Sequence, residues 1–163
     1  MTMLARTVVA ALLFAAAAPV VAQRNETADR AAIHALLVDY GATLDARDFD
    51  GFARLFAKDG VYVTHGTVAK GPEASEAMRK TFAANASRTR EPNFHLFFNE
   101  VVTFDGPDRA HARSMSLWMK PDDNNRPMAA LSARYEDDLV RQDGHWLFAR
   151  RTVEPITNGP PAK

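Results

Sequence analysis

Residues 128–154 read MAALSARYEDDLVRQDGHWLFARRTVE, and this stretch decides the fold. Two strand patterns, at 128–141 and 145–154, flank Gln142-Asp143-Gly144, a hairpin signal because Asp and Gly tolerate the backbone of short turns. Extended strands rise about 3.3 Å per residue, so both strands are long for a small domain. Strands of this length must twist and curl, and we expect a curved sheet with a concave face.

Further strand patterns lie upstream of this hairpin. Residues 94–104 and 109–120 flank a turn at 105–108, and a short β-branched and aromatic strand is expected at 61–65. Neighbouring strands joined by short turns pair in opposite directions. The sequence therefore predicts an antiparallel sheet.

Helical periodicity dominates the earlier part of the chain. One helical face collects apolar residues at i, i+3, i+4, i+7 and i+11: Ile33, Leu36, Leu37, Tyr40 and Leu44. Asp48 is expected to cap a second, short helix, and a third helix is expected at about 73–86. Helices packed on one face of a curved antiparallel sheet give an α+β fold, here a cone with an internal pocket.

The composition fits one domain that needs no disulfide. The chain has 163 residues, 20 basic and 20 acidic side chains, five His and no Cys. Balanced charge gives no basic surface for nucleic acid, and without Cys there is no thiolate nucleophile or Cys-based zinc site. The His residues do not pair at ligand spacing and no cofactor-binding motif is present, so we expect no metal and no cofactor.

The first 22 residues, MTMLARTVVAALLFAAAAPVVA, resemble an export signal. One cation, Arg6, precedes an apolar run that ends at Pro19, and small residues then lead to an expected cleavage after Ala22. A buried N-terminal helix or a membrane anchor is the alternative. We expect a periplasmic or secreted protein with no membrane partner after cleavage. Residues 23–157 would form one domain, followed by a frayed Pro/Gly-rich tail at 158–163.

Two ionisable residues are the leading candidates for chemistry in the expected pocket. Asp45 lies on the flank of the first helix near its C-terminus, where it is either a solvated surface residue or directed inward. His95 lies in the apolar run Phe94-His95-Leu96-Phe97-Phe98, so it is either a core histidine or a tuned acid/base group. Strict alternation would put Phe97 and Asn99 on the same face as His95.

Other pocket candidates come from the inward faces assigned to the remaining elements. They are expected to bind substrate. Ordinary packing is the alternative for Tyr40, Tyr135 and the three residues Met115, Leu117 and Met119, and a sheet ion pair is the alternative for Arg113. These candidates are Tyr40, Tyr62, Thr64, Arg113, Met115, Leu117, Met119 and Tyr135.

Several strings resemble a known superfamily. Residues 45–60 (DARDFDGFARLFAKDG) and 135–151 (YEDDLVRQDGHWLFARR) are similar to the nuclear transport factor 2-like superfamily, specifically its SnoaL-like branch. The resemblance implies the cystatin-like α+β cone. Residues 43–50 and 93–99 resemble the segments that carry the catalytic Asp and His of scytalone dehydratase. Hexachlorocyclohexane dehydrochlorinase has a similar Asp and His.

This resemblance implies that Asp45 and His95 form an acid/base pair. Leu44 stands where scytalone dehydratase has a tyrosine, so the substrate is expected to differ, with Arg113, Tyr62 or Tyr135 as its anchor. We expect an exported, cofactor-independent lyase of dehydratase or dehydrohalogenase type, acting on a small hydrophobic aromatic or alicyclic compound. An isomerase using the same pair and a non-catalytic binding protein are the alternatives. A homo-oligomer, dimer or trimer, is expected.

Overall fold

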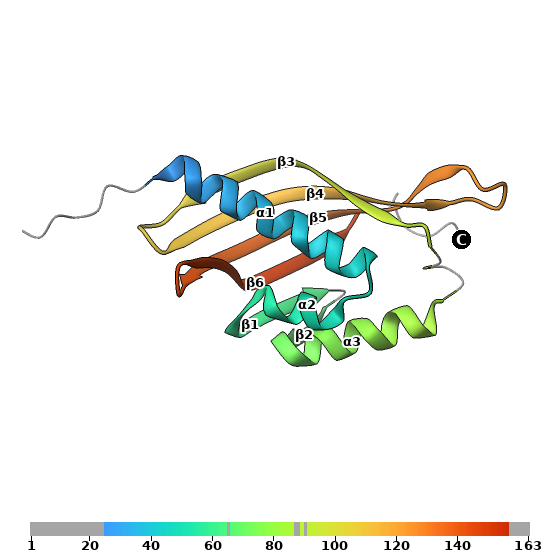
Figure 1. Ribbon diagram of the computed structural model, residues 1–163, viewed down its shortest axis with the longest axis horizontal. Coiled ribbons are helices and arrows are strands. Elements are labelled where there is room, and N and C mark those ends of the chain that lie inside the picture. The colour runs from blue at the N-terminus through green and yellow to red at the C-terminus, as the bar shows by residue number, and fades with distance from the viewer. Residues whose placement is uncertain (1–24, 65, 87–88, 90, 157–163) are drawn as a thin grey trace, which may run out of the picture.

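The structure, a computed structural model, describes residues 25–64, 66–86, 89 and 91–156 (Figure 1). The expected export signal at 1–22 and the expected tail at 158–163 lie outside these residues. Among the described residues, no helix combines the length and hydropathy of a membrane span.

Three helices form among the described residues, each with an identifiable start. The first, α1 (Glu26–Asp45), begins where the Asn25 side chain accepts a hydrogen bond from the amide of Ala28 at 3.1 Å. Asp48 caps α2 (Phe49–Arg54), as predicted, because its Oδ1 accepts from the amide of Gly51 at 2.7 Å. The third helix, α3 (Gly71–Ala84), has Pro in its first turn, where a missing amide hydrogen costs nothing.

In the part of the chain that the structure describes, six strands form a single sheet in the order β2-β1-β6-β5-β4-β3. Their bounds are β1 (Phe56–Thr64), β2 (Thr67–Lys70), β3 (Phe94–Phe104), β4 (Arg109–Pro121), β5 (Pro127–Gln142) and β6 (His145–Pro155). The predicted α+β class is confirmed. Three details of the prediction are wrong: β2 was not expected, β1 begins at Phe56 and not at residue 61, and β1 pairs with β6 in parallel, whereas the other pairs are antiparallel.

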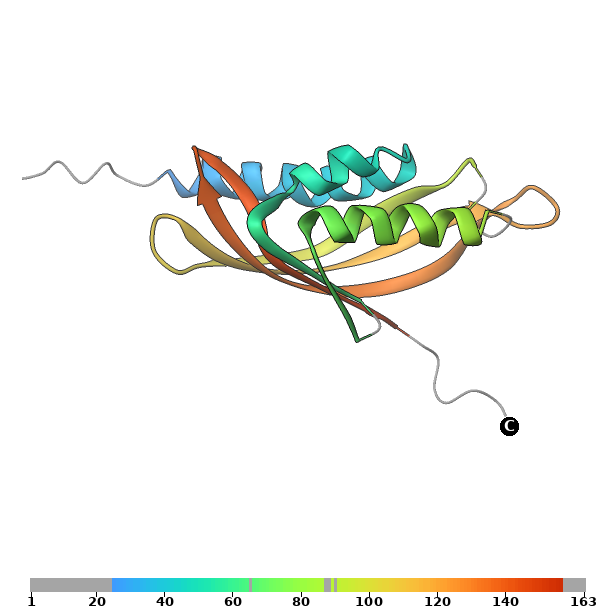
Figure 2. The ribbon, with the colours of Figure 1, turned by 90° about the horizontal axis from the view of Figure 1, so that it is seen from below.

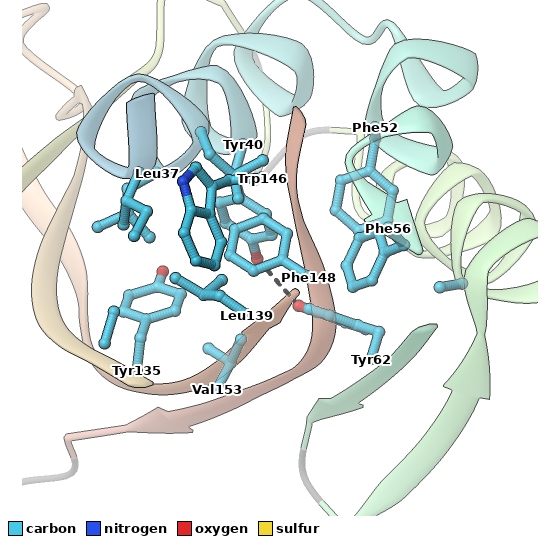
Figure 3. Close-up of a cluster of buried hydrophobic side chains, with 14 of the residues drawn as sticks. Leu37, Tyr40, Phe52, Phe56, Tyr62, Tyr135, Leu139, Trp146, Phe148 and Val153 are labelled. Carbon is cyan, nitrogen blue, oxygen red and sulfur yellow. Dashed lines mark hydrogen bonds between the residues drawn. The ribbon is translucent and has the colours of Figure 1, made fainter. Parts of the chain in front are cut away.

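All three helices lie on one side of the curved sheet (Figure 2). Irregular register between Phe98 and Val101, between Trp118 and Met119, and near Asp138 marks bulges that bend the long strands. Between helices and sheet lies an aromatic and aliphatic core (Figure 3). Its fully buried residues include Ile33 and Leu37 from α1, Phe52 from α2 and Phe148 from β6.

Candidate functional site

Asp45 is the last residue of α1 and His95 is the second residue of β3. Their side chains meet where these two elements come together. The Nδ1 atom of His95 lies 2.7 Å from Oδ1 of Asp45, and the backbone amide of His95 donates to Oδ2 at 2.8 Å. The His95 side chain is 11% exposed and that of Asp45 is 18% exposed. One carboxylate therefore fixes both the backbone and the ring of His95.

This arrangement selects the tautomer of His95. A carboxylate has only acceptors, so the Nδ1 atom that faces it carries the proton. In the neutral ring, Nε2 is then left with a free lone pair. His95 lines an internal cavity, so the pair can present a base to a bound molecule.

The close approach of β3 to α1 depends on Gly41, one helical turn before Asp45. A Cβ atom at this position would lie 2.9 Å from Cβ of His95 and 2.9 Å from Cε2 of Phe97. Contacts that short are essentially never made by real side chains. The missing side chain of Gly41 thus allows His95 to reach Asp45.

The cavity beside His95 has a volume of about 260 Å³ and a mainly apolar lining. Its walls come from both sheet and helices, and the lining residues are Tyr40, Leu44, Tyr62, Thr64, Met78, Thr81, Phe82, Thr89, His95, Trp118, Leu131, Ala133, Tyr135, Val153 and Pro155. Larger hollows lie near the turn at 142–145, over the far end of the sheet and beside α2, but none of these is lined by Asp45 or His95. We therefore take the smaller cavity as the candidate site.

Three tyrosines place hydroxyl groups around this cavity. The hydroxyls of Tyr40 and Tyr62 lie 3.1 Å apart (Figure 3), and that of Tyr135 lies 2.9 Å from Oγ of Ser116. Burial raises the pKa of Tyr62 to about 12 and also raises the pKa values of Tyr40 and Tyr135. All three phenols are therefore protonated at neutral pH and can act as hydrogen-bond donors.

A buried ion pair lies beneath the tyrosines. Nη1 of Arg151 lies 3.2 Å from Oδ2 of Asp137, and neither side chain is exposed. The guanidinium carbon lies 4.0 Å from the ring centroid of Tyr40 and 4.2 Å from that of Tyr135. Burial raises the pKa of Asp137 to about 7, and the Arg151 charge opposes this rise.

The structure brings most of the predicted helix and sheet residues to one place. Tyr40, Tyr62, Thr64 and Tyr135 line the cavity with His95. Phe97 points the same way and stacks on the His95 ring, with the ring centroids 6.2 Å apart. The roles assigned to these residues remain predictions.

The predicted inward face of β4 is wrong. Ala110, Ala112, Ser114 and Ser116 are buried, whereas Arg113 is exposed and three apolar neighbours share its outer face: Met115, Leu117 and Met119. Alternation defines two faces but does not say which one meets the helices. The buried face of β4 carries small side chains, of which Ser116 bonds to the buried hydroxyl of Tyr135, and the four predicted pocket residues lie on the opposite face.

Asn99 also does not join the site. It adopts a positive φ of 53° within the irregular register between Phe98 and Val101, and its side chain is exposed. The bulge breaks strict alternation, so Asn99 does not share the face of His95.

Sequence reasoning named five of the fifteen residues that line the cavity and missed the other ten. Among the missed residues is Trp118, which pairs in register with His95 and lines the cavity beside it. Arg151 was not singled out, because mid-strand arginines mostly face solvent. One signal was available for Arg151. Alternation from Tyr135 places Asp137 on the same inward face, and an inward carboxylate on one strand favours an arginine partner on the paired strand. Within the described part of the chain, no three His, Cys, Asp or Glu side chains group as a metal site would require.

Comparison with known proteins identifies relatives over most of the chain. The family model described as SnoaL-like domain matches residues 25–152. The uncharacterized protein Rv2910c of Mycobacterium tuberculosis is 28% identical over 127 residues, which are 77% of this chain and 84% of the relative.

Similar solved structures show the same fold. Rv3472 from Mycobacterium tuberculosis, a protein of unknown function, has 29% identity and a TM-score of 0.68, over 80% of this chain and 73% of that one. A protein from Novosphingobium aromaticivorans assigned as a scytalone dehydratase has 22% identity and a TM-score of 0.65, over 81% and 87%. LinA has 23% identity and a TM-score of 0.66, over 83% and 97%.

Proposed function

The chain belongs to the SnoaL-like domain family, and we propose that it is a cofactor-independent lyase of dehydratase or dehydrohalogenase type. The observation that carries the proposal is the Asp45–His95 pair, bonded at 2.7 Å, in which His95 lines an apolar cavity. Structural neighbours of dehydratase and dehydrochlorinase type share the fold and add support from outside the chain.

The proposed reaction is an elimination. Nε2 of His95 removes a proton from a substrate carbon, and the electron pair of that C–H bond forms a carbon–carbon double bond. The bond to the neighbouring leaving group breaks and its electron pair leaves with the group, which departs as halide, or as water when the His95 imidazolium returns the proton to the leaving oxygen. Asp45 holds the ring of His95 and stabilises the imidazolium that forms, as an oriented carboxylate does in other His-based sites.

The hydroxyl pair of Tyr40 and Tyr62 supplies the polar contact for the substrate. Each phenol is buried and protonated, so the pair can donate a hydrogen bond to an oxygen or halogen beside the reacting carbon. Such a donor stabilises the charge that develops on the leaving group or on an adjacent carbonyl.

The cavity restricts the size and polarity of the substrate. Its volume of about 260 Å³ is slightly below the common range of ligand pockets, about 300–1,000 Å³. Most of its lining is aromatic or aliphatic. We therefore propose a small hydrophobic aromatic or alicyclic substrate.

Native mass spectrometry with a library of hydroxylated, halogenated and unsubstituted ring compounds tests this proposal. A product lighter by water or hydrogen halide that disappears in His95→Gln and Asp45→Asn supports the lyase. The matched control is His111→Gln, because His111 and Asp138 also bond at 2.7 Å but are 60% and 53% exposed on the outer sheet face. An equal-mass product would instead indicate an isomerase, and ligands retained unchanged by wild type and variants would indicate a binding protein.

We propose export as well, on the sequence of residues 1–22 alone. Expression of the full chain in a bacterial host with fractionation tests this. A periplasmic or extracellular product that begins at Gln23 supports it, and an unprocessed cytoplasmic product contradicts it.

We propose a homo-oligomer that buries the apolar outer face of β3 and β4. Phe94, Leu96 and Phe98 are 44%, 46% and 37% exposed on the edge strand of the sheet, an unusual apolar strip for a monomer. Next to this strip, Arg113 of β4 lies opposite Glu136 of β5, and Arg134 of β5 lies opposite Glu154 of β6. This face therefore offers both positive and negative side chains to the charged side chains of a second copy.

Light scattering after size exclusion measures the assembly. Leu96→Glu is expected to reduce the mass to that of a monomer, whereas Thr103→Glu, at another exposed position of β3, is not. A monomeric wild type at high micromolar concentration would contradict the proposal.

A further inference from the structure

Arg47, two residues after Asp45, caps the end of α1. Its Nη1 atom donates to the carbonyl of Leu44 at 2.8 Å and to that of Asp45 at 3.1 Å. The last carbonyls of a helix have no partner within the helix and carry its negative end charge. The guanidinium satisfies two of them and places a cation where the helix dipole favours one.

The same guanidinium also binds the segment that leads into β3. Its Nη2 atom donates to Oδ1 of Asn93 at 2.8 Å and to the carbonyl of Thr89. Asn93 is buried and lies two residues before His95. The end of α1 and the start of β3 are therefore joined twice, once by Asp45 and His95 and once by Arg47 and Asn93.

Arg47 also contacts the wall of the cavity. Its guanidinium carbon lies 4.4 Å from the ring centroid of Phe82, and both Phe82 and Thr89 line the cavity beside His95. One planar group thus connects the helix end, the strand start and the cavity wall.

We propose that Arg47 is the positioning residue of the Asp45–His95 pair, setting the distance between carboxylate and imidazole while touching neither the substrate nor the His95 ring. As a catalytic proposal it rests on the proposed function. As a structural one it does not, because the geometry of the pair can be measured without a substrate. A lysine would keep the charge, but it lacks the fork that binds acceptors on both segments.

Hydrogen exchange at His95 provides the test. The amide of His95 donates to Asp45, whereas the amide of Val102 lies farther along the same strand, beyond the bulge. In Arg47→Lys we expect the exchange rate at His95 to rise about tenfold relative to Val102, because a local opening affects only the amides it exposes. ¹⁵N spectra should also show loss of the pure Nδ1-protonated tautomer of His95.

Two further variants make the result specific. Arg54→Lys is the matched control, because the Arg54 side chain is 73% exposed. Among the described residues its one ion pair is with Asp48, at 3.8 Å. Asn93→Ala removes the acceptor on the β3 side and leaves the helix cap intact. It should raise the exchange rate of the His95 amide as Arg47→Lys does. In the double variant the two changes should not add, because both break the same bond. If Arg47→Lys does not fold, Asn93→Ala alone tests the proposal.

The outcomes separate a positioning role from a general stabilising one. If both variants lower stability but raise exchange at His95 and Val102 equally, the proposal is overturned. If the pair is disturbed as expected but wild type turns over no substrate, the proposed function fails and the structural inference stands. If a substrate is found, Arg47→Lys should lower kcat at least tenfold with KM nearly unchanged.

Discussion

Replacing Gly41 with alanine tests how closely α1 and β3 must pack for His95 to reach Asp45. The new Cβ would lie 2.9 Å from Cβ of His95, whereas ordinary contacts begin at 3.4 Å, so β3 must retreat by about 0.5 Å. The bond of 2.7 Å between His95 and Asp45 would then lengthen to about 3.2 Å, the outer limit of a hydrogen bond.

The stability change is the difference of two opposing effects. Alanine in a helix interior is more favourable than glycine by about 0.8–1.0 kcal/mol. Overpacking a filled core costs about 1–3 kcal/mol. We therefore expect Gly41→Ala to lower the free energy of unfolding by about 0–2 kcal/mol, while turnover falls much further because the pair is displaced.

Urea unfolding and turnover together check this prediction. Gly71→Ala, at the start of α3, is the control, because a Cβ there would meet only Cβ of Phe56, at 3.9 Å. A Gly41→Ala protein that is more stable than wild type and retains full turnover would refute the reasoning, since the close approach would then have no consequence.

Three other changes give distinct expectations. Arg151→Met leaves Asp137 buried without a counter-charge, which costs about 3–5 kcal/mol. The pKa of Asp137, about 7 when folded, lies above its usual value of 3.8, so its favourable contribution is complete below pH 3.8 and is lost as the pH rises through 7. Removing Arg151 raises this pKa further, so urea unfolding should show a larger loss at pH 8 than at pH 5. Asn99→Gly should change the thermal midpoint by no more than the equivalent of about 0.5 kcal/mol, because glycine adopts the φ of 53° freely, and should leave turnover intact. Tyr62→Phe removes the bond to Tyr40 and should lower stability by about 1 kcal/mol in urea unfolding and kcat/KM about tenfold in a turnover assay.

Local patterns predicted most of the fold. The 3.6-residue period of α1 and the turns at 105–108 and 142–144 depend on neighbouring residues, and β3 begins and ends where the pattern placed it. The start of β1 was predicted five residues too late, at residue 61 instead of Phe56. Lys58-Asp59-Gly60 is typical of a helix end, and the parallel pairing with β6 that extends the strand comes from the other end of the chain.

The site was less accessible to such reasoning. From spacing alone, Asp45 could be a surface or a pocket residue, and His95 could be a core histidine or a pocket residue. The family resemblance, and not the spacing, predicted that the two form a pair. The faces of β4 were assigned by hydrophobicity, which favoured Met115 and its neighbours. The structure instead buries Ser114 and Ser116 there. Which face of β4 is buried depends on residues distant in sequence, such as Tyr135 of β5, whose hydroxyl bonds to Ser116, and the sequence of the strand alone does not contain that contact.

The position of Asp45 itself argues that the pair is functional. A carboxylate in the last turn of a helix is disfavoured by the dipole, by about 0.3–1 kcal/mol at the surface and more when buried. Here the carboxylate is largely covered and accepts two bonds from His95, while Arg47 binds the helix carbonyls beside it. An alanine at this position would need none of these compensations. Local rules of stability are mostly broken where a site requires it, and α1 breaks two within one turn, with glycine at 41 and aspartate at 45.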